Sequence, residues 1–162
     1  MILIIDFGSQ YNQLIARRVR ENHVYCQIEP PGISIAAIRE MEPEGIILSG
    51  GPASIYSKGA PRVDKKIFKL GIPVLGICYG LQYMIDSLGG KVISSPKREY
   101  GFAELLVKTQ KGIFRGVARK TPCWMSHGDS IGELPKGFAV TATTANTAVA
   151  AAQDVRRHFY GL

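Results

Sequence analysis

The sequence predicts an α/β fold with a central, mostly parallel sheet flanked by helices and a more antiparallel C-terminal half. Residues 1–48 alternate short apolar runs with helix-period segments, the β-α-β-α-β order of a parallel sheet. The run 73–77 is short and almost wholly apolar, as a central parallel strand is. From Lys91 onward, apolar runs are joined by turns rich in Gly, Pro and Ser, which favours antiparallel strands.

The first half of the chain is expected to contain four strands and three helices. The strands are predicted at residues 1–5, 24–28, 46–48 and 73–77, and the helices at 9–22, 34–41 and 61–70. Ser9 and Ser34 are suitable N-caps for the first two helices. The residues expected on the inner face of the first helix are Tyr11, Leu14, Ile15 and Val19. Pro61 and Gly71 are expected to bound the third helix.

A fourth helix is predicted directly after Cys78. Its apolar residues recur at helical spacing from Leu81 to Leu88, and Gly89 and Gly90 end it. Further strands are predicted at residues 91–94, 103–109, 137–144 and 148–152. The apolar run 158–162 has no turn or polar tail behind it, so it reads as a strand that stops partway.

Length and composition favour one soluble domain over residues 1–162, with no second domain. The chain is 46% hydrophobic and 20% charged, without a repeat or a linker. The first carboxylate, Asp6, comes too early for a secretory leader, and no apolar run approaches the roughly 20 residues that span a bilayer. Three widely spaced cysteines without a C-x-x-C pair argue against disulfides and zinc. We expect a cytoplasmic protein with no metal and no membrane partner.

The net charge of +7 raises nucleic acid as a partner. However, the basic residues are scattered along the chain, and no aromatic stacking platform accompanies them. Solvated basic faces are therefore favoured over nucleic-acid binding. A docking surface for an acidic neighbouring domain remains a third option.

The strongest local signal is Cys78, in a G-x-C-x-G pattern between a buried strand and an amphipathic helix. This setting resembles a nucleophile elbow, whose flanking residues must lack bulk because the chain bends sharply. The N-terminus of the following helix would favour a Cys78 thiolate, and the Tyr79 N–H would point at an oxyanion. The alternative is a buried cysteine that only packs.

One loop and two other cysteines give weaker signals than this elbow. Residues 49–52 (Ser-Gly-Gly-Pro) follow the strand at 46–48, so Gly51 is a candidate for a second oxyanion donor, with an ordinary tight turn as the alternative. Cys26 and Cys123 lack the strand-to-helix setting, and both are predicted to be packing residues.

Four motifs together resemble the class-I, triad-type glutamine amidotransferases, and within that family the GMP synthetases. The second and third motifs are shared across the family, whereas the first and fourth are typical of the GMP synthetases. In order, the motifs are D-F-G-S-Q-Y at 6–11, S-G-G-P at 49–52, G-I-C-Y-G-L-Q at 76–82 and W-M-S-H-G-D-S at 124–130.

The resemblance implies hydrolysis of L-glutamine through a Cys78 thioester, with ammonia passed to a synthetase that aminates XMP to GMP. Gly51 and Tyr79 would form the oxyanion hole. The residues implied in substrate binding are Gly50, Gln82, Ser126, His127, Gly128 and Asp129. The resemblance implies no cofactor for this domain, because ATP and Mg²⁺ would bind to the synthetase domain. That synthetase domain would lie on the same polypeptide or on a separate subunit. The full enzyme is expected to be homodimeric.

The family's catalytic base is a histidine followed two residues later by a glutamate, in a sequence like Q-F-H-P-E-V after F-Y-G-L. By this resemblance the histidine would lie three residues past Leu162, so the 162-residue fragment is expected to be inactive. His158 precedes that position by seven residues, roughly 23 Å of extended strand, and His127 belongs to the substrate motif. Two rivals remain: a glutaminase for anthranilate or aminodeoxychorismate synthesis, and a non-catalytic flavodoxin-like regulatory domain.

Overall fold

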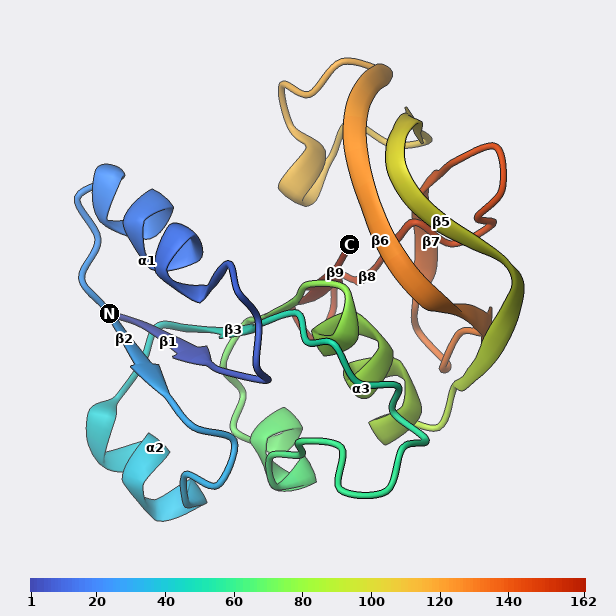
Figure 1. Ribbon diagram of the computed structural model, residues 1–162. Coiled ribbons are helices and arrows are strands. Elements are labelled where there is room, and N and C mark those ends of the chain that lie inside the picture. The colour runs from blue at the N-terminus through green and yellow to red at the C-terminus, as the bar shows by residue number, and fades with distance from the viewer.

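The structure is a computed structural model that describes residues 1–94, 101–125 and 128–162. It contains one nine-stranded sheet in the order β2-β1-β3-β4-β9-β8-β7-β5-β6 (Figure 1). In chain order the strands are β1 (Ile2–Ile5), β2 (Cys26–Glu29), β3 (Gly45–Leu48), β4 (Val74–Gly76), β5 (Lys91–Val107), β6 (Lys120–Glu133), β7 (Ala139–Thr143), β8 (Ala151–Asp154) and β9 (Phe159–Gly161). The helices are α1 (Asn12–Glu21), α2 (Ile35–Met41) and α3 (Tyr79–Ser87), with 3₁₀ turns η1 (Lys65–Lys69) and η2 (Gly112–Phe114).

The sheet is parallel in one half and antiparallel in the other. Strands β2, β1, β3, β4 and β9 pair in parallel, and β9 then pairs antiparallel with β8. The remaining pairs, β8 with β7, β7 with β5 and β5 with β6, are all antiparallel. The predicted fold class is confirmed.

Helices cover both faces of the parallel half. Alternate residues of β1 point to opposite faces: Leu3 packs in the cluster that contains Ile38 of α2 and Met84 of α3, whereas Ile4 packs against Ala16 of α1. Figure 1 shows α1 on one side of these strands and α2 and α3 on the other. This arrangement explains the apolar runs of the short strands, because helices pack on both faces of this part of the sheet.

The helix predicted at residues 61–70 is largely wrong, since only η1 forms there. Two tyrosines of α3 explain the difference. The Tyr79 hydroxyl donates to the Pro61 carbonyl oxygen at 2.7 Å, and the Tyr83 hydroxyl donates to the Val63 carbonyl oxygen. Burial raises the pKa of both phenols, which keeps them protonated as donors. The carbonyl groups that would accept the first hydrogen bonds of the predicted helix therefore bind tyrosine side chains of α3 instead.

The first helix begins later than predicted. The Ser9 hydroxyl accepts the Tyr11 N–H at 3.1 Å in a local turn, and α1 starts at Asn12. Tyr11 and Leu14, predicted to face the core, are 54% and 46% exposed. The cap predicted for the second helix is confirmed, because the Ser34 hydroxyl accepts the Ala37 N–H at 3.1 Å.

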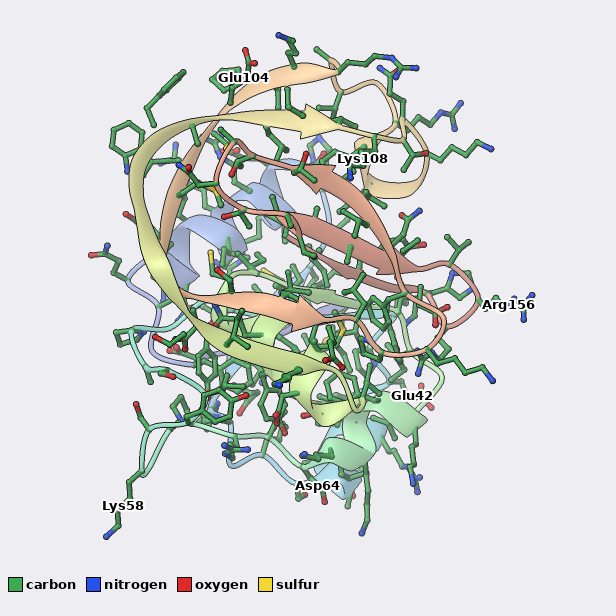
Figure 2. All side chains as sticks on the ribbon, turned by 90° about the vertical axis from the view of Figure 1, so that its right-hand side faces the viewer. Glu42, Lys58, Asp64, Glu104, Lys108 and Arg156 are labelled. Atoms are coloured by element: carbon green, nitrogen blue, oxygen red, sulfur yellow. The ribbon has the colours of Figure 1, made fainter. Side chains whose placement is uncertain are left out.

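In the C-terminal half, two predicted strands join and one strand was missed. The segments predicted at 91–94 and 103–109 belong mainly to the single strand β5, and β6 was not predicted. The described parts of the two strands pair antiparallel, with Phe102 opposite Trp124. Figure 2 shows β5 as a long curved strand, with Glu104 near one end of the molecule and Asp64 near the other.

Among the residues that the structure describes, no helix is long and apolar enough to cross a bilayer.

Candidate active site

Cys78 occupies a strained backbone conformation at the carboxyl end of β4. Its φ of 48° and ψ of −108° lie outside the regions that L-residues normally adopt. A Cβ on Gly76 would lie 2.6 Å from the Leu81 nitrogen, and one on Gly80 would collide with the Leu48 carbonyl oxygen. The glycines that flank Cys78 are therefore needed for steric reasons, as the elbow interpretation predicts.

Two hydrogen bonds that this turn donates to the neighbouring strands hold its backbone in place. The Ile77 N–H donates to the Leu48 carbonyl at the end of β3, at 2.9 Å. The Cys78 N–H donates to the Leu162 carbonyl beyond β9, at 2.7 Å. Strands on both sides of β4 thus fix the backbone of Cys78, which supports the strained conformation.

The Cys78 side chain is open to solvent on one side but surrounded by protein atoms on the others. Desolvation raises the pKa of its thiol above the ordinary value. The predicted stabilisation of a thiolate by the α3 N-terminus acts in the opposite direction and stays a prediction. Burial favours the neutral thiol, which needs a base before it can attack a carbonyl.

On one side of Cys78 lies a mainly apolar cavity of ≈ 130 Å³, here named the α3–β6 cavity. Its walls bring Cys78 together with two of the predicted substrate residues, Gln82 and Asp129. Gln82 is 8% exposed, and its side-chain amide donates to the Asp129 carbonyl oxygen at 3.2 Å, which ties α3 to β6. Gly128 lies in β6 beside Asp129 but does not line this cavity. Two further predicted substrate residues, Ser126 and His127, lie outside the described residues.

On the other side of Cys78 lies a second cavity of ≈ 350 Å³, here named the loop cavity. The loop cavity is lined by residues 8–11, residues 50–52 and Cys78. The predicted site residues Gly50 and Gly51 therefore share this cavity with Cys78. Tyr79 follows Cys78 directly at the start of α3. Within the described part of the chain, neither the Gly51 N–H nor the Tyr79 N–H donates to an acceptor. Both donors are thus available beside Cys78.

Several residues at the site were not predicted. Ser9, Gln10 and Tyr11 line the loop cavity, although their motif was interpreted only as a sign of the pathway. Residues 147, 149 and 150 line the α3–β6 cavity, and no local pattern marks them. Cys123, predicted to be a packing residue, also lines the α3–β6 cavity, whereas Cys26 is buried with its thiol 3.4 Å from the Ala16 carbonyl oxygen.

His158 is far from Cys78, as the sequence predicts. It immediately precedes β9, where its carbonyl accepts the N–H of Val74, the first residue of β4. Cys78 follows the other end of β4. His158 and Cys78 therefore lie at opposite ends of this strand, and these ends are roughly 13 Å apart. In the described ranges, no group of three His, Cys, Asp or Glu side chains is placed to hold a metal ion.

The protein is similar in sequence to GMP synthases. It is 55% identical over 161 residues to the glutamine-hydrolysing GMP synthase of Heliobacterium modesticaldum, covering 99% of the chain and 31% of that protein. It is 52% identical to the same enzyme of Clostridium botulinum, covering 100% of the chain and 32% of that protein. The chain therefore spans about a third of the length of these relatives.

Solved structures show the same fold. A Thermoplasma acidophilum protein described as a GMP synthase subunit superposes with a TM-score of 0.88 at 29% identity, covering 99% of this chain and 80% of the other. A glutamine amidotransferase from Thermotoga maritima superposes with a TM-score of 0.81 at 20% identity, a likeness of fold. The family description "Glutamine amidotransferase class-I" matches residues 3–162. The chain therefore belongs to the class-I glutamine amidotransferase family.

Proposed function

We propose that the chain is the glutamine-hydrolysing domain of a GMP synthase, with Cys78 as its nucleophile. One observation carries the proposal. Cys78 lies in a strained strand-to-helix turn between two cavities, beside two backbone N–H groups, of Gly51 and Tyr79, without acceptors in the described ranges. A nucleophile with free backbone N–H donors nearby is what acyl transfer from an amide requires.

The chemistry begins with attack of the Cys78 sulfur on the side-chain amide carbon of glutamine. The carbonyl oxygen becomes an oxyanion held by the Gly51 and Tyr79 N–H groups. When the C–N bond breaks, the nitrogen takes from the base the proton that the Cys78 thiol gave up on attack and leaves as ammonia, and a thioester of Cys78 remains. Water then attacks the thioester carbon, which releases glutamate and restores the thiol.

The α3–β6 cavity is proposed to seat the substrate. Gln82 and Asp129 lie at one side of it, where Asp129 would contact the α-amino end of glutamine. Gly50, Ser126, His127 and Gly128 remain candidate substrate residues from the resemblance. The mainly apolar wall near Cys78 suits the methylene groups of glutamine and excludes competing water.

The base is proposed to be a histidine that follows Leu162 in the natural protein. The raised pKa of Cys78 means that the thiol requires such a partner. The hydrogen bond from the Cys78 N–H to the Leu162 carbonyl supports this position, because residues that continue from β9 emerge beside the sulfur.

The ammonia is proposed to aminate XMP to GMP in a synthetase domain that uses ATP and Mg²⁺, in a homodimeric, cytoplasmic enzyme. Identities of 52–55% to GMP synthases over nearly all of this chain favour this pathway over anthranilate or aminodeoxychorismate synthesis. Residues 1–162 would form one glutaminase domain that is incomplete at its C-terminus, and the continuous sheet supports a single domain.

The test uses the natural protein that contains this chain. With glutamine, XMP, ATP and Mg²⁺, we expect ammonia release and GMP formation. Cys78→Ala should abolish both with glutamine but leave GMP formation from added ammonium salts intact, whereas the matched Cys26→Ala variant should keep glutaminase activity. Glutamine hydrolysis by Cys78→Ala, or ammonia transfer to chorismate in place of XMP, would contradict the proposal.

A further inference from the structure

Ser49 lies directly behind the loop that carries Gly51. It follows β3, is fully buried, and its own N–H donates to the Ile5 carbonyl at 3.1 Å. Its hydroxyl oxygen accepts the Phe7 N–H at 2.9 Å and donates to the Gly50 carbonyl oxygen, also at 2.9 Å. A hydroxyl has one proton to donate, so its acceptance of the Phe7 N–H leaves that proton for Gly50.

This contact determines which way the Gly50–Gly51 peptide faces. None of the described residues forms a cis peptide bond, and in a trans peptide the C=O and the following N–H point in opposite directions. With the Gly50 carbonyl held inward at Ser49, the Gly51 N–H is directed away from the Ser49 hydroxyl. Gly51 itself lines the loop cavity with Cys78.

Without such a restraint this peptide would turn easily, because glycines on both sides of it permit many backbone conformations. Gly51 also packs so closely on Phe7 that an added Cβ would lie 2.5 Å from the Phe7 carbonyl oxygen. Phe7 thus contacts the loop twice, through its N–H to Ser49 and through its carbonyl beside Gly51. The D-F-G-S-Q-Y segment, otherwise unexplained, supports the loop from behind.

We propose that Ser49 is a positioning residue for the glutaminase reaction, whose hydroxyl orients the Gly50–Gly51 peptide so that the Gly51 N–H faces the oxyanion. The inference rests on the proposed function and assigns Ser49 and Phe7 a part in it. Without the hydroxyl, the buried Phe7 N–H and Gly50 carbonyl both lose a partner. The Gly50–Gly51 peptide can then rotate so that its carbonyl faces water in the loop cavity. After this rotation the Gly51 N–H points away from the oxyanion.

The experiment compares Ser49→Ala with wild type in the natural protein that contains this chain. We expect kcat for glutamine hydrolysis to fall about 100-fold, the lower range for loss of one oxyanion donor. KM should stay within about twofold, because the donor acts on charge that develops only in the transition state. Ser49→Thr retains the hydroxyl and should restore most of kcat.

A second readout separates this role from general damage to the site. Iodoacetamide alkylates Cys78 by displacing iodide, with no addition to a carbonyl and therefore no oxyanion. Its rate at Cys78, followed by peptide mass mapping, should be the same in Ser49→Ala as in wild type. Ser34→Ala, which removes a helix cap on α2 away from the site, controls for lost stability and should keep full kcat.

The proposal is overturned if Ser49→Ala keeps kcat within threefold of wild type, if alkylation slows in parallel with kcat, or if Ser34→Ala loses as much activity. Wild-type protein that releases no ammonia from glutamine would instead refute the glutaminase function itself, and the role of Ser49 with it. If Ser49→Thr fails to fold, the alkylation and KM readouts on Ser49→Ala still decide.

Discussion

The backbone N–H of Cys78 donates a hydrogen bond to the carbonyl oxygen of Leu162 across 2.7 Å. The bond extends the parallel pairing of β4 with β9 past the end of both strands. Residues at the carboxyl end of β9 and Cys78 are therefore neighbours at one edge of the sheet. In parallel sheets this edge is where ligands bind and catalytic groups meet.

The first prediction concerns the base. The 162-residue chain alone should release ammonia from glutamine at least about 100-fold more slowly than a longer protein that includes the proposed histidine, because a general base typically contributes that factor or more. In that longer protein, replacing by Ala the histidine that the family resemblance implies three positions after Leu162 should produce the same loss. Equal rates for the two proteins would contradict a base in this position; circular dichroism spectra would check that both are folded.

The second prediction concerns the ionisation of Cys78. Burial raises its pKa, so in the 162-residue chain the reactive thiolate is a minor species at pH 7. The rate of iodoacetamide alkylation at Cys78 should increase with pH and should continue to increase above about pH 8.5, the value of an ordinary thiol. Peptide mass mapping distinguishes Cys78 from Cys123. A rate that is already constant near pH 7 would show a stabilised thiolate instead.

The elbow was predictable because its signal is local. An apolar strand, a cysteine between two glycines and an amphipathic helix lie within residues 73–88, and sterics require both glycines. The parallel order of the first strands was predictable for the same reason, since each strand is a short apolar run between helical segments.

The parts that sequence reasoning missed depend on tertiary partners. Residues 61–70 have a helical pattern, but tyrosines of α3 hold the carbonyls of Pro61 and Val63. β6 is stabilised by pairing with β5, which its own polar and glycine-containing sequence does not reveal. Likewise, the role of Ser49 depends on Phe7, a partner 42 residues away.

The third prediction tests the close packing of the elbow. Gly80→Ala places a methyl group against the Leu48 carbonyl, so it should lower the free energy of unfolding by about 1–3 kcal/mol, as overpacking does. Gly32→Ala is a matched control because a Cβ there meets nothing within 4 Å, and it should change stability by less than about 0.5 kcal/mol. Urea denaturation would measure both. Equal midpoints for the two variants would contradict the packing argument.

The last prediction concerns the turn between β8 and β9, which sets the position of β9 beside the elbow. Asp154 is 3% exposed, and its carboxylate accepts hydrogen bonds from the Arg156 N–H, the Arg157 N–H and the Arg157 guanidinium. Desolvation by burial opposes ionisation of Asp154, but these hydrogen bonds and the Arg157 charge outweigh it and lower its pKa. Asp154→Asn should therefore cost about 1–3 kcal/mol of stability near pH 7.

The sign of the pH dependence follows from the lowered pKa. The folded state binds the Asp154 proton less readily than the unfolded state, so this stabilisation is complete above the unfolded value of about 3.9 and is lost as the pH falls through the folded pKa. The difference in the free energy of unfolding between wild type and Asp154→Asn should thus be constant from pH 6 to 8 and should become smaller below about pH 4. Arg157→Met removes the charged partner and should reduce this pH dependence. Thermal unfolding of both proteins across the pH series would measure this difference in stability. A difference that stays constant down to pH 3 would contradict a paired, ionised Asp154.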